Sequence, residues 1–203
     1  MKDHNLKTFK ELGVHEDFIK ALHGLRITKP TEIQELTIPI LLNSNTDLVA
    51  QAQTGTGKTA AFGLPLLQKI DVSLNHIQGL ILCPTRELAQ QIAKQLFRFT
   101  KFSDRIFTEA VYGGEKIDRQ IIALLRPTHI VVATPGRLID LSKKKAIKID
   151  KVRTVILDEG DEMLSMGFQK ELNQILELIP KDSHKWLFSA TMPSMILKLA
   201  KKY

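Results

Sequence analysis

A glycine-rich octapeptide, AQTGTGKT at residues 52–59, contains the residue types that hold a nucleotide polyphosphate. Gly55 and Gly57 would let the backbone N–H groups of a loop turn inward around a phosphate. Lys58 would reach the β- and γ-phosphates, and the hydroxyl of Thr59 would ligate Mg²⁺. A helix that starts at this point would add partial positive charge from its N-terminus.

The setting of this octapeptide agrees with its chemistry. It follows an apolar run, residues 47–52, and it opens a segment of helical composition, residues 58–67. This strand–loop–helix order is the context that a phosphate-binding loop requires. The strict pattern begins with glycine six residues before the lysine, whereas this sequence has Ala52 there. The alternative interpretation is a glycine-rich turn that binds no ligand.

A second group of reactive side chains ends the apolar run TVILDEGD, residues 154–161. Asp158 stands where an acid beside a phosphate-binding loop holds Mg²⁺, here through water. Glu159 follows at once and could orient and deprotonate the water that attacks a phosphoanhydride. The alternative is an acidic helix N-cap without catalytic function. Together the two motifs predict a Mg²⁺-dependent nucleoside triphosphatase.

Strands and helices must position these groups, and the sequence predicts that they alternate. Several apolar runs are apolar on successive residues, as is typical of strands buried on both faces of a parallel sheet. Strands that alternate with long helical segments predict βαβ units with right-handed crossovers. The predicted strands are residues 47–52, 79–84, 106–112, 129–134, 154–159 and 185–191.

Three of the intervening segments have apolar residues at helical spacing. The predicted faces are Leu88, Ile92, Leu96 and Phe99; Ile117, Ile121 and Leu124 or Leu125; and Leu172, Ile175, Leu176 and Ile179. The first 45 residues are helical in pattern and lack a strong strand. We therefore expect a single domain over residues 1–203, with a helical preface at 1–45 and an α/β body at 46–203.

Composition limits the class of protein. The 203 residues are 43% hydrophobic and 25% charged, a balance typical of one soluble globular domain and unlike that of a disordered chain. No run approaches the ~18 apolar residues of a membrane span, and the N-terminus lacks the apolar core of a secretory signal. Cys83 is the only cysteine, so an internal disulfide is excluded. We expect a cytoplasmic protein without a membrane partner.

The net charge of +7 suggests an anionic partner, and its distribution is uneven. Residues 126–153 hold eight Lys or Arg against two Asp, a net charge of +6. Residues 157–180 hold six acidic residues against one basic. The distribution predicts that an anion-binding surface lies apart from a carboxylate cluster.

The order of several short motifs resembles the N-terminal RecA-like domain of a DEAD-box ATP-dependent RNA helicase. The resemblance runs from Phe9 to Thr191, nearly the whole chain. It rests on KPTEIQ (29–34) with Phe9 upstream, AQTGTGKT (52–59), PTRELA (84–89), the pair Gly113–Gly114, TPGR (134–137), DEGD (158–161) and SAT (189–191). Seven such elements in the family order are far more specific than any one of them.

The resemblance implies an adenine site and an ATP cofactor. Gln34 would hydrogen-bond the edge of the adenine and Phe9 would stack on its face, which would give ATP preference over GTP. The structural alternatives are a solvated helix residue for Gln34 and a core anchor for Phe9. The implied ATP-binding loop is Ala52, Gln53, Thr54, Gly55, Thr56, Gly57, Lys58 and Thr59, with Lys58, Asp158 and Glu159 as catalytic residues.

The resemblance also implies contacts with single-stranded or duplex RNA through its phosphate–sugar backbone. The implied RNA-binding residues are Pro84, Thr85, Arg86, Gly113, Gly114, Thr134, Pro135, Gly136 and Arg137. Arginines, glycine N–H groups and helix N-termini are usual phosphate contacts that carry no sequence information. The alternative for Arg86 and Arg137 is an exposed arginine at a helix start. Ser189 and Thr191 would hydrogen-bond Asp161 and so link the ATP and RNA sites.

The resemblance further implies a mostly parallel central sheet with helices on both faces, and a second RecA-like domain across the ATP site. The HRxGRxGR motif of that second domain does not occur in this sequence. We therefore expect a monomeric fragment that binds ATP and RNA weakly and turns ATP over slowly, because an arginine finger contributes on the order of 10³–10⁵ in rate. Two alternatives for the parent remain, a DNA helicase and an ATP-gated RNA clamp that does little unwinding.

Two positions depart from the family pattern. Gly160 stands where the family has alanine, and we expect it to affect stability more than chemistry because the carboxylates are retained. Arg26 stands where the first motif usually starts with glycine, which concerns backbone geometry only.

Overall fold

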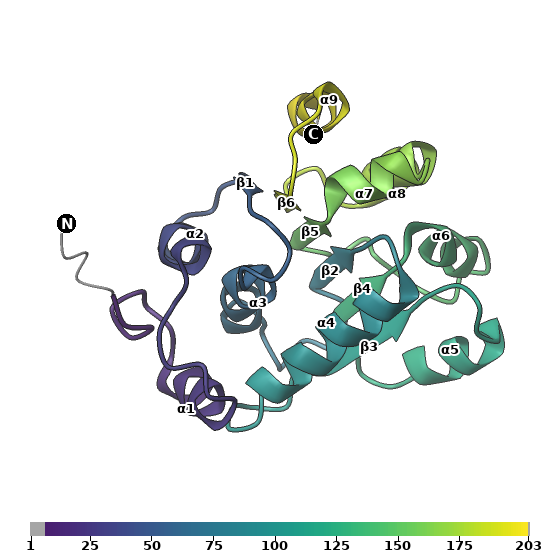
Figure 1. Ribbon diagram of the computed structural model, residues 1–203. Helices are drawn as coiled ribbons and strands as arrows, with labels where there is room; N and C mark the ends of the chain where they lie inside the picture. Colours follow the sequence, from purple (N-terminus) through teal and green to yellow (C-terminus); the bar gives the residue numbers. More distant parts are fainter. Residues whose placement is uncertain (1–6, 203) are drawn as a thin grey trace.

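The computed structural model describes residues 7–202 and contains one six-stranded sheet flanked by helices (Figure 1). The strands are β1 (Leu48–Gln51), β2 (Gly79–Leu82), β3 (Thr108–Val111), β4 (Ile130–Ala133), β5 (Thr154–Asp158) and β6 (His184–Ser189). Every pairing is parallel, and the order across the sheet is β1-β6-β5-β2-β4-β3. All six predicted strands and the parallel arrangement are therefore confirmed.

The helices connect these strands and also precede them. They are α1 (Glu16–Gly24), α2 (Glu32–Asn43), α3 (Lys58–Gln68), α4 (Arg86–Phe99), α5 (Ile117–Leu124), α6 (Pro135–Lys143), α7 (Gly160–Ser165), α8 (Gln169–Leu178) and α9 (Ser194–Lys202). None of the helices within residues 7–202 is long and apolar enough to cross a membrane.

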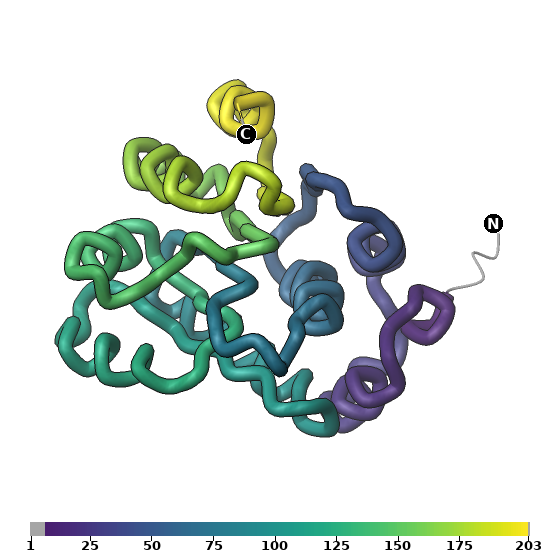
Figure 2. The backbone as a smooth tube through the Cα atoms, turned by 180° about the vertical axis from the view of Figure 1, so that it is seen from behind, coloured from purple at the N-terminus to yellow at the C-terminus, as the bar shows by residue number. Residues whose placement is uncertain are grey.

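Two hydrophobic cores lie on the two faces of the sheet, because successive strand residues point to opposite faces. In β2, Ile81 joins the core that contains α1 to α4, whereas Leu80 and Leu82 join the core that contains α6 to α9. Both views of the chain place the purple N-terminal helices and the yellow-green C-terminal helices on opposite sides (Figures 1 and 2). The prediction of helices on both faces is thus confirmed.

The apolar residues at helical spacing form the buried faces of the helices, as predicted. In α4 the side chains of Ile92, Leu96 and Phe99 are completely buried. At the end of α5 the sequence left Leu124 and Leu125 as alternatives for the buried face. In the structure Leu124 packs against the core, whereas Leu125 is 81% exposed.

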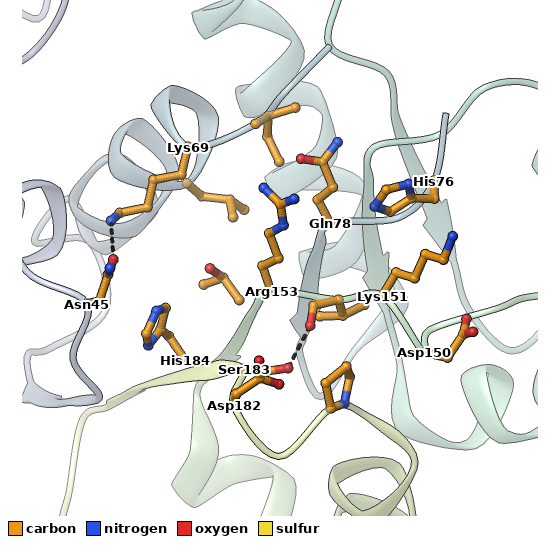
Figure 3. Close-up of a pocket in the computed structure, with 15 residues that line it drawn as sticks. Asn45, Lys69, His76, Gln78, Asp150, Lys151, Arg153, Asp182, Ser183 and His184 are labelled. Carbon is orange, nitrogen blue, oxygen red and sulfur yellow. Dashed lines mark hydrogen bonds between the residues drawn. The ribbon is translucent and has the colours of Figure 1, made fainter. Parts of the chain in front are cut away.

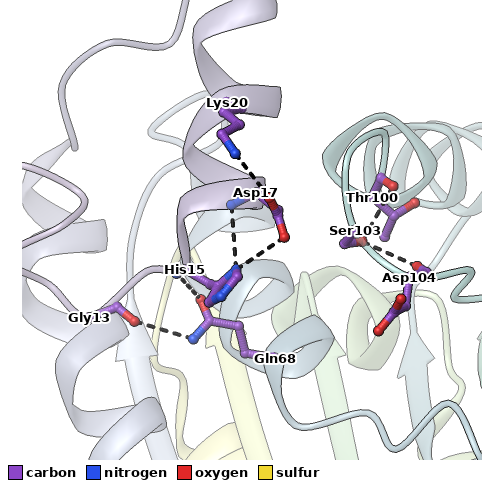
Figure 4. A network of polar contacts seen from close by, with 8 residues as sticks. All are labelled: Gly13, His15, Asp17, Lys20, Gln68, Thr100, Ser103 and Asp104. Carbon is purple, nitrogen blue, oxygen red and sulfur yellow. Dashed lines mark hydrogen bonds and ion pairs between the residues drawn. The ribbon is translucent and has the colours of Figure 1, made fainter.

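Polar contacts join the segment before α1 to the body of the domain (Figure 4). The backbone N–H of His15 donates to Oε1 of Gln68 at the end of α3, and Nε2 of that amide donates to the carbonyl of Gly13. One glutamine side chain therefore pairs with two backbone groups that would otherwise lack a partner in a turn. The described residues before β1 contain α1 and α2 and no strand.

The carboxyl ends of all six strands lie at one edge of the sheet because the strands are parallel. The loops after β1, β5 and β6 contain the two nucleotide motifs and SAT, and these strands are neighbours. The loops after β2, β3 and β4 contain the proposed RNA motifs, and these strands are neighbours too. The strand order thus places two groups of motifs side by side along the edge where α/β proteins bind ligands.

Candidate nucleotide and nucleic-acid site

The loop between β1 and α3 has the backbone that a phosphate-binding loop needs. Gly55 and Gly57 have φ values of +83° and +93°, in the left-handed region that favours glycine. Gly57 is also the N-cap of α3, so the loop ends directly on a helix N-terminus. A side chain at Gly57 would collide with the amide of Gln34, a second reason for glycine here.

Lys58 places a cation at the bottom of this loop. Its Nζ lies 3.8 Å from Oδ1 of Asp158, at the end of β5, and only 5% and 3% of the two side chains are exposed. The ammonium group is buried and makes no hydrogen bond within the described residues. A buried ammonium without hydrogen-bond acceptors is costly, so this geometry suits a lysine whose further partner is an anion.

The two carboxylates of the DEGD segment have different environments. Burial raises the pKa of Asp158 to about 6, although Lys58 opposes the rise and the Glu159 carboxylate adds to it. Glu159 is only partly buried and adopts left-handed backbone angles, φ 54° and ψ 50°, an unfavourable conformation for a residue with a side chain. Its Oε1 accepts a long hydrogen bond of 3.5 Å from the Thr54 hydroxyl, which places Glu159 beside the phosphate-binding loop.

Gln34 contacts the same loop from α2. It is 3% exposed, its Nε2 donates to the carbonyl of Gly57 at 3.0 Å, and its Oε1 accepts from the N–H of Thr31 at 3.0 Å. The solvated helix residue considered from sequence is therefore excluded. The contact with Thr31 was not predicted from the sequence, although the T-x-x-Q spacing of a capping box indicates it.

A cavity of about 500 Å³ lies between the start of α2 and the phosphate-binding loop. Its lining includes Ile33 and Leu36 on one side and Ala52, Gln53 and Thr56 on the other. An apolar wall next to a phosphate loop is the environment that a planar base prefers.

Phe9 does not line this cavity. Its side chain is 2% exposed and belongs to the hydrophobic core formed with α1 to α4. Phe9 is therefore the core anchor that was the alternative interpretation of the sequence. Its ring has no exposed face on which an adenine could stack, contrary to the expectation from the family resemblance. Burial of a large aromatic ring stabilises the attachment of this segment to the body.

Asp161 links the DEGD segment to the loop after β6. The hydroxyl and the N–H of Thr191 both donate to Oδ2 of Asp161, at 2.7 and 2.9 Å. The N–H of Asp161 donates to Oγ of Ser189 at 3.1 Å. Burial alone would raise the pKa of Asp161, but the hydrogen bonds from Thr191 and Ser189 lower it to about 2. The predicted hydrogen bonds are present, whereas the transmission of a signal through them stays a prediction.

The proposed RNA contacts after β2 and β3 lie close together. Nη1 of Arg86, the first residue of α4, donates to the carbonyl of Gly114 at 3.4 Å, and its guanidinium lies 5.0 Å from the centre of the Tyr112 ring. Gly114 has a φ of +79°, and Gly113 is exposed. Tyr112, which sequence analysis missed, thus orients Arg86; an aromatic residue just before a glycine pair is the only sequence signal for it.

Arg137 is partly buried and is anchored by hydrogen bonds to neighbouring segments. Its two terminal nitrogens donate at 2.8 Å to Oε1 of Gln120 and to the carbonyl of Glu115, while its Nε is buried and unpaired. The exposed arginine considered from sequence is therefore excluded. Arg137 fixes the loop after β3 to the start of α6, a role that needs the planar fork of a guanidinium.

The remaining motif residues occupy helix starts and loops on the same edge. Thr85 caps α4 by accepting a hydrogen bond from the N–H of Leu88 at 3.2 Å. Pro84 and Pro135 are buried, and Thr134 and Gly136 are partly exposed at the start of α6. Two helix N-termini therefore face the edge of the sheet next to Gly113 and Gly114.

The two departures from the family pattern have structural explanations. A Cβ on Gly160 would lie 2.8 Å from Cδ1 of Leu187 and 3.0 Å from Cδ1 of Ile196, so neighbouring methyl groups occupy the volume of the missing one. Arg26 follows α1 with a φ of 61°, which explains why the family has glycine there.

The carboxylates alone do not form a metal site. Among residues 7–202 there is no cluster of three or more His, Cys, Asp or Glu side chains that could hold an ion. Mg²⁺ in nucleotide sites is bound by one or two protein groups together with phosphate oxygens and water. Thr59 and Asp158, each beside the phosphate-binding loop, fit that donor set.

A larger cavity, of about 770 Å³, opens at the opposite edge of the sheet, before β2, β5 and β6 (Figure 3). Lys69, Lys151 and Arg153 line it, and Asp150 and Asp182 partly balance their charge. The position of Lys151 and Arg153 corrects the prediction made from the charge distribution. The basic stretch at residues 126–153 is divided between the two edges, so its net charge does not mark the nucleic-acid site.

Cys83 has no features of a nucleophile. Its side chain is completely buried, and burial raises the pKa of its thiol far above the usual range. The structure agrees with an inert core cysteine.

Comparisons with known proteins agree with this geometry. The DEAD/DEAH box helicase family matches residues 31–199. DEAD-box ATP-dependent RNA helicase CshA of Bacillus cereus is 44% identical over 198 residues, which are 98% of this chain and 37% of that protein. Its namesake from Streptococcus pneumoniae is 47% identical over 195 residues, 96% of this chain and 37% of the relative.

A solved structure has the same fold. The crystal structure of a DEAD box protein from the hyperthermophile Methanococcus jannaschii superposes with a TM-score of 0.91 at 44% identity, covering 97% of this chain and 53% of that one. The chain thus spans about 37% of the length of the curated relatives described above. From the phosphate-binding loop, the DEGD and SAT segments and these matches, the chain belongs to the DEAD/DEAH box helicase family.

Proposed function

We propose that this chain is the ATP-binding and RNA-backbone-binding part of an ATP-dependent RNA helicase that acts in the cytoplasm. The whole of residues 1–203 would form one RecA-like unit, with residues 1–45 as the segment that contacts the base. The relatives that carry the name RNA helicase are longer than this chain, so a second RecA-like domain would complete the catalytic site.

The observation that carries the proposal is the buried ammonium of Lys58. It has no hydrogen-bond partner within the described residues, and it lies at a loop whose glycines, Gly55 and Gly57, have positive φ values. The β- and γ-phosphates of ATP would supply the missing acceptors. In a water-poor site this charge interaction is stronger than at a surface.

Thr59 and Asp158 would hold Mg²⁺, which, when bound, neutralises charge on the phosphates during transfer. Glu159 would hold and deprotonate the attacking water. Its position supports this role, because it is less buried than Asp158 and its carboxylate reaches Thr54 of the loop. The left-handed backbone at Glu159 would aim the side chain away from the helix that follows.

Gln34 would read the adenine. Its amide is held between Thr31 and Gly57, which leaves one N–H and one lone pair for a base edge. The neighbouring cavity, lined by Ile33 and Leu36, would hold the ring. Adenine offers a donor and an acceptor on one edge, so a fixed glutamine amide can select it over guanine.

The RNA backbone would lie across the loops after β2, β3 and β4. Arg86, Gly114 and the N-termini of α4 and α6 are gathered there, and such groups bind phosphates irrespective of sequence. Asp161, Ser189 and Thr191 would connect this surface to the ATP site. Target choice would then come from other parts of the protein.

Nucleotide binding to this chain tests the proposal directly. We expect Lys58→Met to weaken binding of a fluorescent ATP analogue at least tenfold, while Lys94→Met, an exposed lysine on α4, leaves it unchanged. GTP should compete less well than ATP, and Gln34→Ala should reduce that difference. Equal affinity of both lysine variants and the wild type would exclude the phosphate-binding role.

Turnover tests the catalytic part. In a protein that joins this chain to a second RecA-like domain, RNA should stimulate ATP hydrolysis and DNA of the same sequence should not, because a backbone reader can recognise the 2′-OH. Glu159→Gln should abolish turnover and keep ATP binding. Persistent turnover in that variant would assign the water to another residue, and stimulation by DNA would favour a DNA helicase.

A further inference from the structure

A groove away from the proposed ATP and RNA sites combines exposed aromatic rings with cations. It has a volume of about 830 Å³ and lies between the ends of α1 and α4 and the start of β3. Phe97 and Phe107 line it, together with Arg98, Lys101 and Arg105. The lining contains no acidic residue. Three cations without a carboxylate among them are the expected lining for an anionic ligand.

The two phenylalanines are unusual for surface residues. Phe97 is 74% exposed and Phe107 is 42% exposed. Phe107 is held in place, because its N–H donates to Nδ1 of buried His129 at 3.1 Å and the two rings lie 5.7 Å apart at an angle of 34°. Large exposed apolar groups in a concave surface mark binding sites, and a ring backed by another ring is a rigid platform.

The cationic side chains of the groove form no hydrogen bonds or ion pairs with other described residues. Within residues 7–202, Arg98 and Arg105 make no side-chain hydrogen bond or ion pair, and Lys101 contacts only the ring of Phe102, 5.1 Å away. All three are exposed. Their positive charges are therefore available to a ligand.

We propose that this groove is an accessory site for single-stranded RNA, in which bases stack on Phe97 and Phe107 and phosphates contact Arg98, Lys101 and Arg105. The proposal rests on the proposed function, in that the chain acts on RNA. Alternating rings and cations are the usual components of single-strand binding, since each base has a stacking face and each phosphate a charge.

Two elements connect the groove to the predicted RNA contacts. Helix α4 begins at Arg86 and reaches the groove at Phe97, eleven positions later, which is about 16 Å along the helix. Strand β3 starts beside Phe107 and runs to the turn at Gly114, whose carbonyl Arg86 contacts. One RNA strand of a few nucleotides could therefore follow α4 and β3 from one place to the other.

An acidic peptide with apolar side chains is the competing ligand. RNA is favoured because the exposed apolar contacts are two planar rings, whereas the aliphatic lining residues Ala21, Leu25 and Ile106 are buried or only partly exposed.

The test measures binding of labelled oligouridylates of about five and about fifteen nucleotides to the 203-residue chain at low salt. We expect Phe97→Ala and Phe107→Ala to weaken binding of the long RNA about tenfold and binding of the short RNA much less. Phe97→Tyr, which keeps the ring, should bind as the wild type does. Leu125→Ala is the matched control, because Leu125 is 81% exposed and lies outside the groove.

Salt dependence adds a second measurement. Arg105→Gln should lower the slope of log affinity against log salt by about 0.7 for the long RNA, since it removes one phosphate contact with a single strand. A slope equal to that of the wild type, or equal affinity of the alanine variants and wild type for the long RNA, would overturn the proposal.

The reference variant Arg86→Ala separates this inference from the proposed function. If Arg86→Ala weakens both RNAs and Phe97→Ala weakens neither, the RNA function stands and the accessory site is refuted. If the wild type binds neither RNA, the accessory site is refuted, while the proposed function is judged by the ATP-binding and turnover measurements described above. Phe97-dependent binding of a peptide of alternating glutamate and leucine, without an effect of Phe97 on RNA, would assign the groove to a protein partner.

Discussion

The Nζ of Lys58 lies 3.8 Å from Oδ1 of Asp158, and both side chains are almost completely buried. One cation thus has two tasks: it neutralises a carboxylate in the protein alone, and it is the proposed ligand of the ATP phosphates. The pair ties β5 to α3 and brings the two nucleotide motifs together. Its energetics can be measured without nucleotide.

Lys58→Met should destabilise the protein more at pH 8 than at pH 5. Burial raises the pKa of Asp158 to about 6, so the folded state binds more protons than the unfolded state between about pH 4 and 6, and stability from this group falls as pH rises through that range. Without the lysine the pKa of Asp158 rises further and the loss extends to higher pH. We expect the free energy of unfolding of Lys58→Met to be about 3 kcal/mol lower than that of the wild type at pH 8, measured by urea unfolding. Equal destabilisation at both pH values would show that the pair is not coupled.

Thr191→Val should weaken the link between the DEGD segment and the loop after β6. The variant loses the 2.7 Å hydrogen bond to Asp161, and the pKa of Asp161 should rise from about 2 towards its ordinary value. Because that pKa is depressed in the folded state, the contribution to stability is present above about pH 4 and is lost as pH falls towards 2. We expect about 1 kcal/mol at pH 7, since the carboxylate is largely solvated.

A carboxylate titration followed by NMR measures this directly. Thr191→Ser keeps the hydroxyl and serves as the control, with a pKa of Asp161 close to that of the wild type. A wild-type pKa in the valine variant would mean that Ser189 and the backbone N–H groups suffice.

Gly160→Ala should change stability and leave nucleotide binding within about twofold. The new methyl group meets Leu187 and Ile196 at 2.8 and 3.0 Å, and the strain of overpacking exceeds the gain in helix propensity. We expect a net destabilisation of about 1 kcal/mol in urea unfolding. In a Leu187→Val background, which removes the nearest methyl group, the same change should be neutral or stabilising. The same loss in both backgrounds would contradict the packing explanation.

Arg26→Gly should stabilise the protein by about 1 kcal/mol, because glycine adopts a φ of 61° without steric cost. The N–H groups of Arg26 and Ile27 bond back to the carbonyls of His23 and Leu22, the pattern of a helix end that favours glycine. Urea unfolding measures the gain. Arg26→Ala removes the side chain but keeps the strain, so its stability should match that of the wild type. A stabilisation by alanine equal to that by glycine would assign the effect to the charge.

The types of residue at the site and the elements that hold them could be predicted from the sequence. Six strands, the helical faces of α4 and α8, the phosphate-binding loop and the DEGD carboxylates all depend on spacing along a few neighbouring residues. Local spacing sets which side chains share a strand or helix face, so it is readable without the fold. The family resemblance added the expected roles of Gln34 and of the Asp161–Thr191 hydrogen bonds, which stay predictions.

Only the tertiary structure decided what depends on distant segments. The strand order β1-β6-β5-β2-β4-β3 pairs strands that lie far apart in the chain, and it alone brings Lys58 to Asp158. Burial of Phe9 and the hydrogen bonds that anchor Arg137 follow from packing between elements, which no local pattern specifies. The division of the basic stretch between two edges of the sheet has the same cause: residues close in sequence separate in space when a strand or a helix runs between them.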